Sequence, residues 1–231
     1  MRGRVATFIA NQSTVGDPAI FESTIFPWAA QLEDETAWKS IQREAAEILS
    51  QAERLPAFQE ISPDQQRISP DDKWKTFFFH GIGYRCERNL LRCPETARWL
   101  ETIPGLETAF FSILAPGKRI KRHRGITKGL IRCHLPLIVP GDSASCGMRI
   151  NKEDVGWEEG KLLIFDDSRK HRVWNDTASH RVVLLFDVRR PMRLPGTLLL
   201  KLLLRGLRMT RYVQDARVNE AAWEESFYAH P

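Results

Sequence analysis

The chain has 231 residues, of which 42% are apolar and 27% charged, and its formal net charge is +5. This length suits one large domain or one domain with extensions, and the apolar content argues against disorder. The four cysteines form no CxxC pair, which argues against a disulfide scaffold and a structural zinc site. No stretch reaches the roughly 18 apolar residues of a membrane span, and the apolar run near the N-terminus is too short for a secretory signal. We therefore expect a cytoplasmic protein.

The N-terminal part is expected to be helix and loop. Residues 34–54 are rich in Ala, Glu and Gln and predict a helix, because apolar residues recur at helical spacing at Trp38, Ile41, Ala45 and Ile48. Residues 55–72 contain three prolines and many polar residues, which is typical of a loop. We expect residues 1–72 to form an extension packed on the core.

The central part has the pattern of a β domain. Residues 75–79 predict a strand, and Pro94 predicts the first turn of a short helix after Cys93. Further short β-type runs, separated by turn residues, follow at 108–114, 130–139, 146–150, 161–166, 171–175 and 180–188. Many short strands at such spacing favour a sandwich, barrel or jelly roll. The predicted class is mainly β with flanking helices (α+β), with the core at residues 73–191.

The C-terminal part, residues 192–231, is expected to be a basic amphipathic helical tail. Residues 188–214 hold seven Arg or Lys and no acid, and Lys201, Arg205 and Arg208 fall on one stripe of a leucine-rich helix. Such a helix either packs its apolar face on the core or contacts a membrane through residues 194–214.

Two histidines lie on separate predicted strands of the β domain. His123 follows a basic turn, and His171 follows a strand and a polar turn 48 residues later. Each histidine can be an ordinary polar residue whose ring nitrogens are hydrogen-bonded within the fold. Together at strand edges they can also bind a metal, and imidazole suits Fe(II) with open positions for co-substrates.

Arg181 opens an otherwise apolar predicted strand, where a charged residue needs a partner. That partner can be Asp166 or Asp187 at the rim of the fold, or the carboxylate of a ligand, which arginine binds in a bidentate manner. Arg132 and His134 are two residues apart and face the same side of their strand.

Three runs, HRGITKGLIRCHLPLIVP, GWEEGKLLIFDDSRKHRVWND and HRVVLLFDVRRP, resemble the aspartyl/asparaginyl β-hydroxylase family over residues 75–191. The resemblance implies a double-stranded β-helix (a cupin-like jelly roll), with Fe(II) held by His123 and His171. It implies 2-oxoglutarate bound by Arg181 and assisted by Ser112, Arg132 and His134, and hydroxylation of an unactivated C–H bond with dioxygen. The spacing of Cys86 and Cys93 matches a disulfide of some relatives, although a reducing cytosol favours thiols.

One position departs from the wider oxygenase superfamily. The usual HxD…H or HxE…H triad would place a carboxylate two residues after His123, where this chain has Gly125. The resembling subfamily shares this absence, so a water is expected at the vacant metal position. Asp167 is the expected catalytic partner of that water. Asp166 is the alternative, and its other interpretation is a residue that caps the strand.

The substrate implied by the resemblance is an aspartyl or asparaginyl residue, or an acyl chain of an anionic lipid of the lipid A or ornithine lipid type. A basic run surrounds His123 and contains no acid between Glu107 and Asp142: Lys118, Arg119, Lys121, Arg122, Arg124, Lys128 and Arg132. It can be a solvated loop, or it can dock the protein peripherally on the inner face of a membrane. A non-catalytic jelly-roll module for an anionic ligand is the alternative. Nucleic-acid binding is not expected, because aromatic residues do not interleave with the basic ones.

Overall fold

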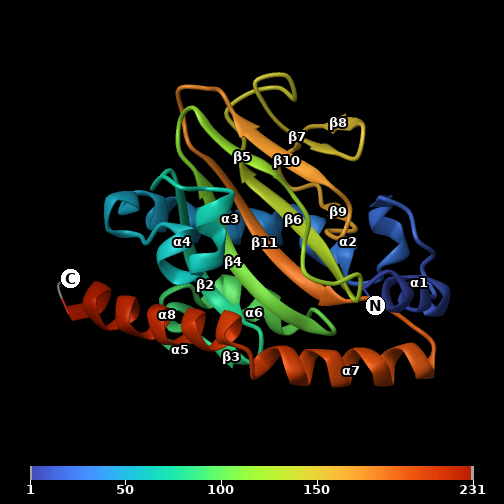
Figure 1. The fold of residues 1–231 in the computed structure, drawn as a ribbon. Helices are drawn as coiled ribbons and strands as arrows, with labels where there is room; N and C mark the ends of the chain where they lie inside the picture. The colour runs from blue at the N-terminus through green and yellow to red at the C-terminus, as the bar shows by residue number, and fades with distance from the viewer. Residues whose placement is uncertain (1, 230–231) are drawn as a thin grey trace.

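The computed structural model describes residues 2–229, which fold around two antiparallel sheets (Figure 1). The larger sheet has the strand order β1 (Ile20–Phe21), β9 (Leu163–Phe165), β6 (Leu130–Ile138), β11 (Arg181–Arg189), β4 (Leu106–Leu114), β2 (Trp74–Gly81) and β3 (Tyr84–Arg85). The smaller sheet has the order β5 (Lys118–His123), β10 (His171–Asn175), β7 (Cys146–Ile150) and β8 (Glu153–Val155).

From β4 to β11 the chain alternates between the two sheets, except that β7 and β8 form a hairpin within the smaller one. Apolar side chains meet between them, with Leu114 and Phe165 from the larger sheet and Ile120, Met148 and Val173 from the smaller. Facing antiparallel sheets whose strands are visited alternately define a double-stranded β-helix. The predicted fold is thereby confirmed, and its core is one apolar layer between the sheets and another behind the larger sheet.

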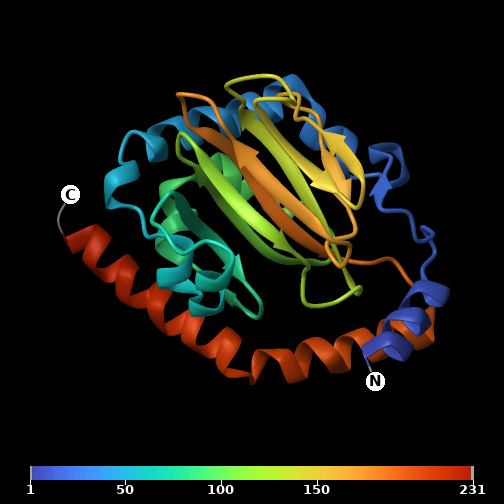
Figure 2. The same ribbon diagram turned by 45° about the horizontal axis from the view of Figure 1, so that its top comes forward.

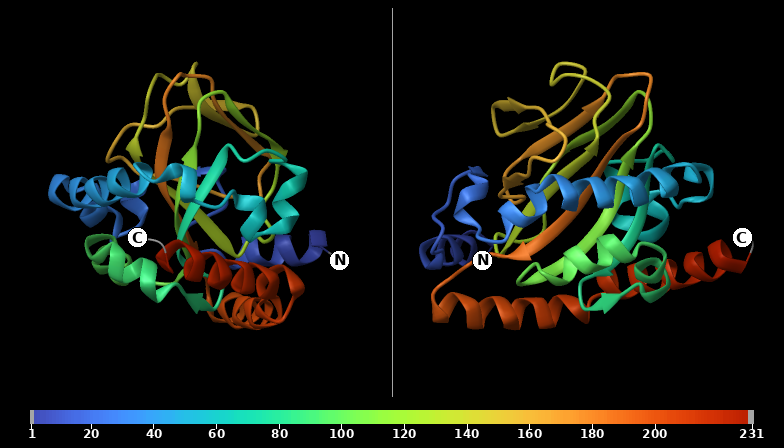
Figure 3. Two further views of the ribbon diagram at one scale, coloured as in Figure 1. Left: turned by 90° about the vertical axis from the view of Figure 1, so that its left-hand side faces the viewer. Right: turned by 180° about the vertical axis from the view of Figure 1, so that it is seen from behind.

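Helices cover the outer face of the larger sheet. The helix α3 (Glu35–Leu49) begins at Asp34, whose side chain accepts a hydrogen bond from the Thr36 amide at 2.9 Å. Its buried side chains Ile41 and Ile48 join the cluster behind the sheet, and Figure 3 shows α3 crossing that sheet. The prediction of a helix over 34–54 is confirmed. The other helices in this region are α2 (Ala29–Glu33), α5 (Glu87–Arg92) and α6 (Pro94–Glu101), whereas α1 (Arg2–Gln12) contacts the C-terminal helix over residues 194–208.

The prediction of a loop over 55–72 is wrong. The short helix α4 (Phe58–Ile61) and a 3-10 turn over Pro63–Arg67 occupy part of this segment. The Phe58 ring lies 4.6 Å from the Trp74 ring and 5.4 Å from the Phe110 ring, centroid to centroid. This aromatic contact with the sheet fixes a segment whose prolines indicated irregular structure.

The basic segment before His123 is a strand, β5, and the interpretation of residues 118–124 as a turn or solvated loop is wrong. Ile120 and the aliphatic part of Lys118 are buried, and Arg119 and Lys121 are exposed. The Lys118 ammonium reaches Asp71 at 2.5 Å. Buried and exposed side chains therefore alternate as in any strand. One of the buried positions holds Lys118 in place of an apolar residue, and its partner Asp71 lies 47 residues away.

The C-terminal residues form two helices, α7 (Leu194–Arg208) and α8 (Arg211–Ala229), which run along one side of the molecule (Figure 2). The predicted leucine-rich helix is confirmed as α7, whose buried Leu200 and Leu204 pack on Leu130. The rest of the predicted helical tail is a separate helix, α8, whose Trp223 and Phe227 rings contact Phe77 of the larger sheet.

Candidate functional site

The two histidines lie side by side in the smaller sheet. His123 at the end of β5 pairs with His171 at the start of β10, and their ring centroids are 4.1 Å apart. Each Nδ1 lies against a backbone carbonyl, of Lys121 at 2.7 Å and of Arg169 at 2.9 Å. A carbonyl only accepts, so Nδ1 carries the proton and the Nε2 lone pair is left for a ligand. Burial lowers the pKa of both histidines to about 4, so both are neutral at pH 7, as metal binding requires.

Asp167 fills the space that a side chain at position 125 would occupy. The Gly125 amide donates to the Asp167 carbonyl at 2.8 Å, and a Cβ atom added to Gly125 would overlap Oδ2 of Asp167. Oδ1 of the same carboxyl group lies 3.3 Å from Nε2 of His171. Both atoms are hydrogen-bond acceptors when the groups are in their unprotonated forms, so this approach is favourable only with a proton or a cation between them.

Arg181 is 1% exposed and forms no ion pair within residues 2–229. Its Nη1 donates to the Ser112 carbonyl at 3.2 Å, and its guanidinium lies 4.8 Å from the Trp157 ring centroid, but its Nε has no partner. Burial lowers its pKa to about 10. The acids considered as its partners pair elsewhere, Asp187 with Arg132 and Asp166 with Lys128 and Arg190. A buried cation without an anion is the expected state of a site that binds an anionic ligand.

A second unpaired donor lies beside this arginine. The Trp157 indole donates to Nδ1 of His134 at 3.3 Å, so Nε2 of His134 carries the proton, and that buried N–H has no partner. The Ser112 hydroxyl accepts from Trp74 at 2.9 Å, which leaves its own proton free to donate. The Phe165 ring lies between His134 and His171, at 5.2 and 5.5 Å. One phenyl ring thus separates His134 from His171, and Trp157 and Ser112 link Arg181 to the same site.

A cavity of about 130 Å³ opens next to His123. His123, Asp167, Arg132 and Asp187 supply its polar wall, and most of the remaining lining is apolar or aromatic, including Phe58, Trp74, Phe78, Ile82, Phe110 and Val213. Neutral imidazoles, an unpaired arginine and an apolar cavity together form the candidate active site.

The profile of the Aspartyl/Asparaginyl beta-hydroxylase family matches residues 35–191. The chain belongs to this family. The resemblance seen in the three sequence runs is confirmed, and with it the expectation of a 2-oxoglutarate-dependent hydroxylase.

Two relatives have names that give different substrates. An ornithine lipid ester-linked acyl 2-hydroxylase of Rhizobium tropici is 40% identical over 215 residues, which is 93% of this chain and 76% of that protein. The human aspartyl/asparaginyl beta-hydroxylase is 33% identical over 168 residues, which is 70% of this chain and only 21% of the human protein. Among solved structures, a prolyl-4-hydroxylase of Pseudomonas putida aligns with a TM-score of 0.43 and 19% identity, over 71% of this chain and 98% of the other.

Arg132, which the family resemblance assigned to 2-oxoglutarate, is engaged by two carboxylates. Its Nε and Nη2 donate to Asp187 at 2.9 and 3.0 Å, and its Nη1 donates to Asp167 at 2.8 Å. This placement favours orientation of Asp167 over contact with a co-substrate. The Arg132–Asp167 and Arg132–Asp187 contacts could not be predicted from the sequence, because the partners are 35 and 55 residues apart.

Two further side chains of the site were not identified from the hydroxylase sequence pattern. Trp157 holds both Arg181 and His134, although nothing distinguished it from the other tryptophans. Tyr212 reaches the cavity wall from α8, outside the family match. Burial raises its pKa, so it is a neutral hydrogen-bonding group at pH 7.

Proposed function

We propose that the chain is an Fe(II)- and 2-oxoglutarate-dependent dioxygenase that hydroxylates an acyl chain of an anionic lipid of the ornithine lipid type. The observation that carries this proposal is Arg181, a buried cation without an anion within residues 2–229. Trp157 contacts both Arg181 and His134, and one phenyl ring separates His134, with its unpaired N–H, from His171. A dicarboxylate that also reaches a metal is the ligand that satisfies both ends of this arrangement.

His123 and His171 are the proposed iron ligands, through their Nε2 atoms. A pair of protein ligands agrees with Gly125, which supplies no carboxylate two residues after His123. Fe(II) would supply the activation of dioxygen for attack on a C–H bond. The carbonyls of Lys121 and Arg169 fix the orientation of both rings. Asp167 is placed to accept a hydrogen bond from a water at the remaining position.

Arg181 is the proposed anchor of a 2-oxoglutarate carboxylate. Nε2–H of His134 and the hydroxyl proton of Ser112 are the further donors, and the Trp157 ring fixes the guanidinium. Because all of these groups are buried, water competes poorly for the carboxylate, and the hydrogen bonds gain strength.

The proposed substrate follows from the cavity lining and from the relatives. Aromatic and aliphatic side chains dominate the wall beside His123, which suits a segment of an acyl chain better than the carboxylate of an aspartyl residue. The relative with the acyl substrate also matches 93% of this chain. Arg124 at the cavity is the feature that favours an aspartyl substrate.

The metal proposal is tested by anaerobic titration of the purified protein with Fe(II) and then 2-oxoglutarate. We expect a visible charge-transfer band for the wild type and none for His171→Ala or His123→Ala, because each variant removes one of two protein ligands. His180→Ala is the matched control, since His180 lies in the turn before β11 and should leave the band unchanged. A band of equal intensity in both ligand variants would refute the assignment.

Substrate preference is tested with the same protein under oxygen. Succinate formation coupled to hydroxylation of an ornithine-type acyl lipid is the expected result. Turnover of an aspartyl peptide instead of the lipid would move the assignment to the second substrate class of the family.

We also propose that α7 docks the protein on an anionic membrane. Leu194, Leu198 and Leu202 repeat every four residues on the face opposite the buried Leu200 and are 70%, 55% and 66% exposed. No helix within residues 2–229 is long and apolar enough to cross a membrane. The buried face of α7 packs on Leu130, which lines the site cavity. Interfacial binding of α7 would therefore bring a lipid substrate to the cavity.

The unpaired basic residues around His123 and on α7 support the anionic character of the membrane. Four of the seven around His123 are neutralised: Lys118, Arg119, Lys128 and Arg132 pair with aspartates. Lys121, Arg122 and Arg124 are exposed and form no ion pair within residues 2–229. On α7, Lys201 and Arg205 are exposed beside the leucine stripe.

The docking proposal predicts a loss of vesicle binding in Leu198→Glu/Leu202→Glu. Since burying one leucine contributes roughly 1.5 kcal/mol or more, we expect binding to anionic vesicles to fall at least about tenfold in a sedimentation assay. Leu91→Glu, an equally exposed leucine on α5, should bind as the wild type does. Unchanged binding of the double variant would disprove docking through α7.

A further inference from the structure

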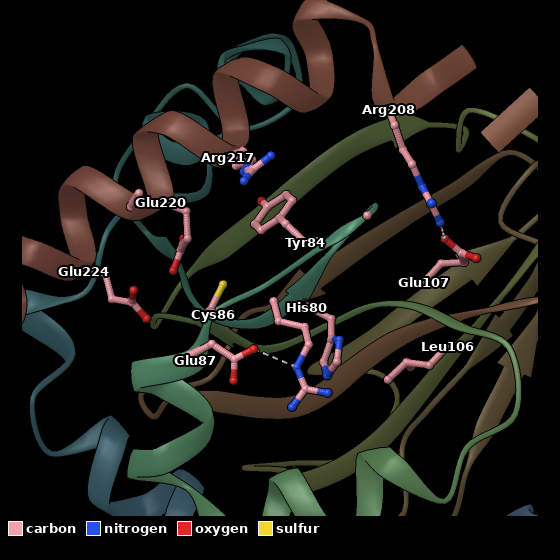
Figure 4. Close-up of a pocket in the computed structure, with 14 residues that line it drawn as sticks. His80, Tyr84, Cys86, Glu87, Leu106, Glu107, Arg208, Arg217, Glu220 and Glu224 are labelled. Carbon is pink, nitrogen blue, oxygen red and sulfur yellow. Dashed lines mark hydrogen bonds and ion pairs between the residues drawn. The ribbon is translucent and has the colours of Figure 1, made fainter. Parts of the chain in front are cut away.

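A second and larger cavity lies between the β2–β3 hairpin and α8. Its volume is about 600 Å³, and Figure 4 shows its lining. Gly81 and Tyr84 line both this cavity and the site cavity, so the two adjoin. The Tyr84 ring lies directly on Gly81, where any Cβ atom would overlap it. One aromatic ring and one glycine therefore separate the second cavity from the candidate active site.

The most unusual side chain of this cavity is Glu220 on α8. It is 2% exposed, its Oε1 accepts a hydrogen bond from the Asn89 side chain at 3.2 Å, and its Oε2 has no partner. In Figure 4 the Glu220 carboxyl group points from the helix toward Cys86, and Glu224 extends from the same helix beside it. A buried carboxyl oxygen without a donor is rare and costly unless a ligand satisfies it.

The charges around Glu220 leave the position of one cation empty. Arg85 pairs with Glu87 at 3.0 Å and Arg208 with Glu107 at 3.3 Å, so these acids are neutralised. Glu220 and Glu224 form no ion pair within residues 2–229. Burial and the neighbouring Glu224 raise the pKa of Glu220 to about 8. Arg217 lies at the exposed rim of the same cavity and also has no ion pair in this part of the chain.

We propose that this cavity binds a primary ammonium group, held by Glu220 and Glu224, with a carboxylate of the same ligand at Arg217. The inference names the headgroup end of the substrate and thus rests on the proposed function. An amino-acid headgroup in this cavity would leave the acyl chain free to enter the adjoining site cavity past Tyr84. An ammonium group supplies the donor that Oε2 lacks, and its charge offsets the repulsion between the two carboxyl groups.

If Glu220 had only a structural role, replacing it would lower the melting temperature. The proposal predicts the opposite at pH 8. Glutamine keeps the acceptor for Asn89 and removes the buried acid. In the folded protein the pKa of Glu220 lies above its usual value of 4.5 and is about 8. Wild-type stability therefore falls as the pH rises from about 4.5 to about 8. Glu220→Gln should therefore raise the melting temperature by a few degrees at pH 8 and leave it unchanged at pH 4. The titratable groups that face Glu220 in this comparison are Tyr84, Cys86, Glu87, Arg217 and Glu224.

Binding is measured on the iron-free protein by ligand-observed NMR, so the result does not depend on hydroxylation. The probes are Nα-acetylornithine, which has one ammonium and one carboxylate, and Nα-acetylnorvaline, which lacks the ammonium. We expect the first alone to bind the wild type, at least tenfold weaker binding to Glu220→Gln, and unchanged binding to Glu225→Gln, an exposed acid of α8. A third arm presents the same headgroup on an ornithine lipid in mixed micelles.

The arms distinguish a free amino acid from a lipid headgroup. Glu220-dependent binding of the soluble probe supports the site for either source, and Glu220-dependent binding of the micellar lipid alone assigns the ligand to a lipid. Absence of ammonium-dependent binding in both forms, or equal binding by Glu220→Gln, overturns the proposal. Because iron and 2-oxoglutarate are absent, a failed charge-transfer test of the active site leaves this result standing, and the reverse is equally true.

Discussion

Replacing Arg181 with methionine is expected to weaken 2-oxoglutarate binding by about 100-fold without destabilising the protein. The guanidinium is buried among Trp157, Ser112 and His134 and has no acidic partner within residues 2–229. Its desolvation therefore opposes folding, and an apolar side chain of similar length relieves that cost. The carboxylate of the co-substrate would lose its only cation in this pocket, a loss of roughly 3 kcal/mol or about 100-fold in affinity.

The measurement combines thermal unfolding with the anaerobic 2-oxoglutarate titration. Arg190→Met is a matched control, because Arg190 is equally buried but pairs with Asp166 at 3.1 Å and donates to the carbonyls of Gly16 and Lys128. This control should lower the melting temperature and preserve the affinity for 2-oxoglutarate in the folded fraction. A destabilised Arg181→Met with normal affinity would show that Arg181 is structural.

Adding a single methyl group at Gly125 is expected to lower the rate of hydroxylation by about tenfold to a hundredfold, the usual range for groups that orient metal ligands. The added Cβ overlaps Oδ2 of Asp167. The carboxyl group must then turn away, which breaks its contact with Arg132 and its approach to His171. Iron should still bind, because neither histidine is displaced directly.

A double-mutant cycle separates this mechanism from general disruption. If Gly125→Ala acts only by moving Asp167, the double variant Gly125→Ala/Asp167→Ala should be no slower than Asp167→Ala alone. Additive losses would mean that Gly125 matters for another reason, such as access to the metal. Gly125→Asp should likewise fail to restore a conventional triad, since the space for its carboxyl group is already filled by Asp167.

The strands that form the core could be predicted because their apolar residues are contiguous in sequence. Runs such as residues 130–138 and 181–189 are buried along almost their whole length, which local composition reflects. The helix α3 was equally predictable from its spacing and from Asp34 at its start. The family resemblance then supplied the roles of the two histidines and of Arg181, which periodicity alone left open.

The parts that could not be predicted depend on partners far apart in sequence. β5 escaped prediction because Lys118 occupies an apolar position and its acid, Asp71, lies outside the local pattern. The same applies to Arg132, whose two aspartates come from β11 and from the turn before His171. Glu220 and Tyr212 belong to α8, whose position against the sheet is set by tertiary aromatic contacts such as that of Trp223 with Phe77.

The ion pairs around β5 reduce the number of basic residues that can attract an anionic surface through solution. Seven basic residues with no acid between them suggest a strong and long-ranged attraction to anionic surfaces, but aspartates neutralise four of them at close range. Only Lys121, Arg122 and Arg124 remain to act across the Debye length, which is about 8 Å at physiological ionic strength. At roughly 1 kcal/mol for each basic residue near a membrane surface, this segment contributes about 3 kcal/mol rather than about 7. If the protein docks on such a surface as proposed, these basic residues would make the encounter salt-sensitive, and the exposed leucines of α7 would hold the protein there.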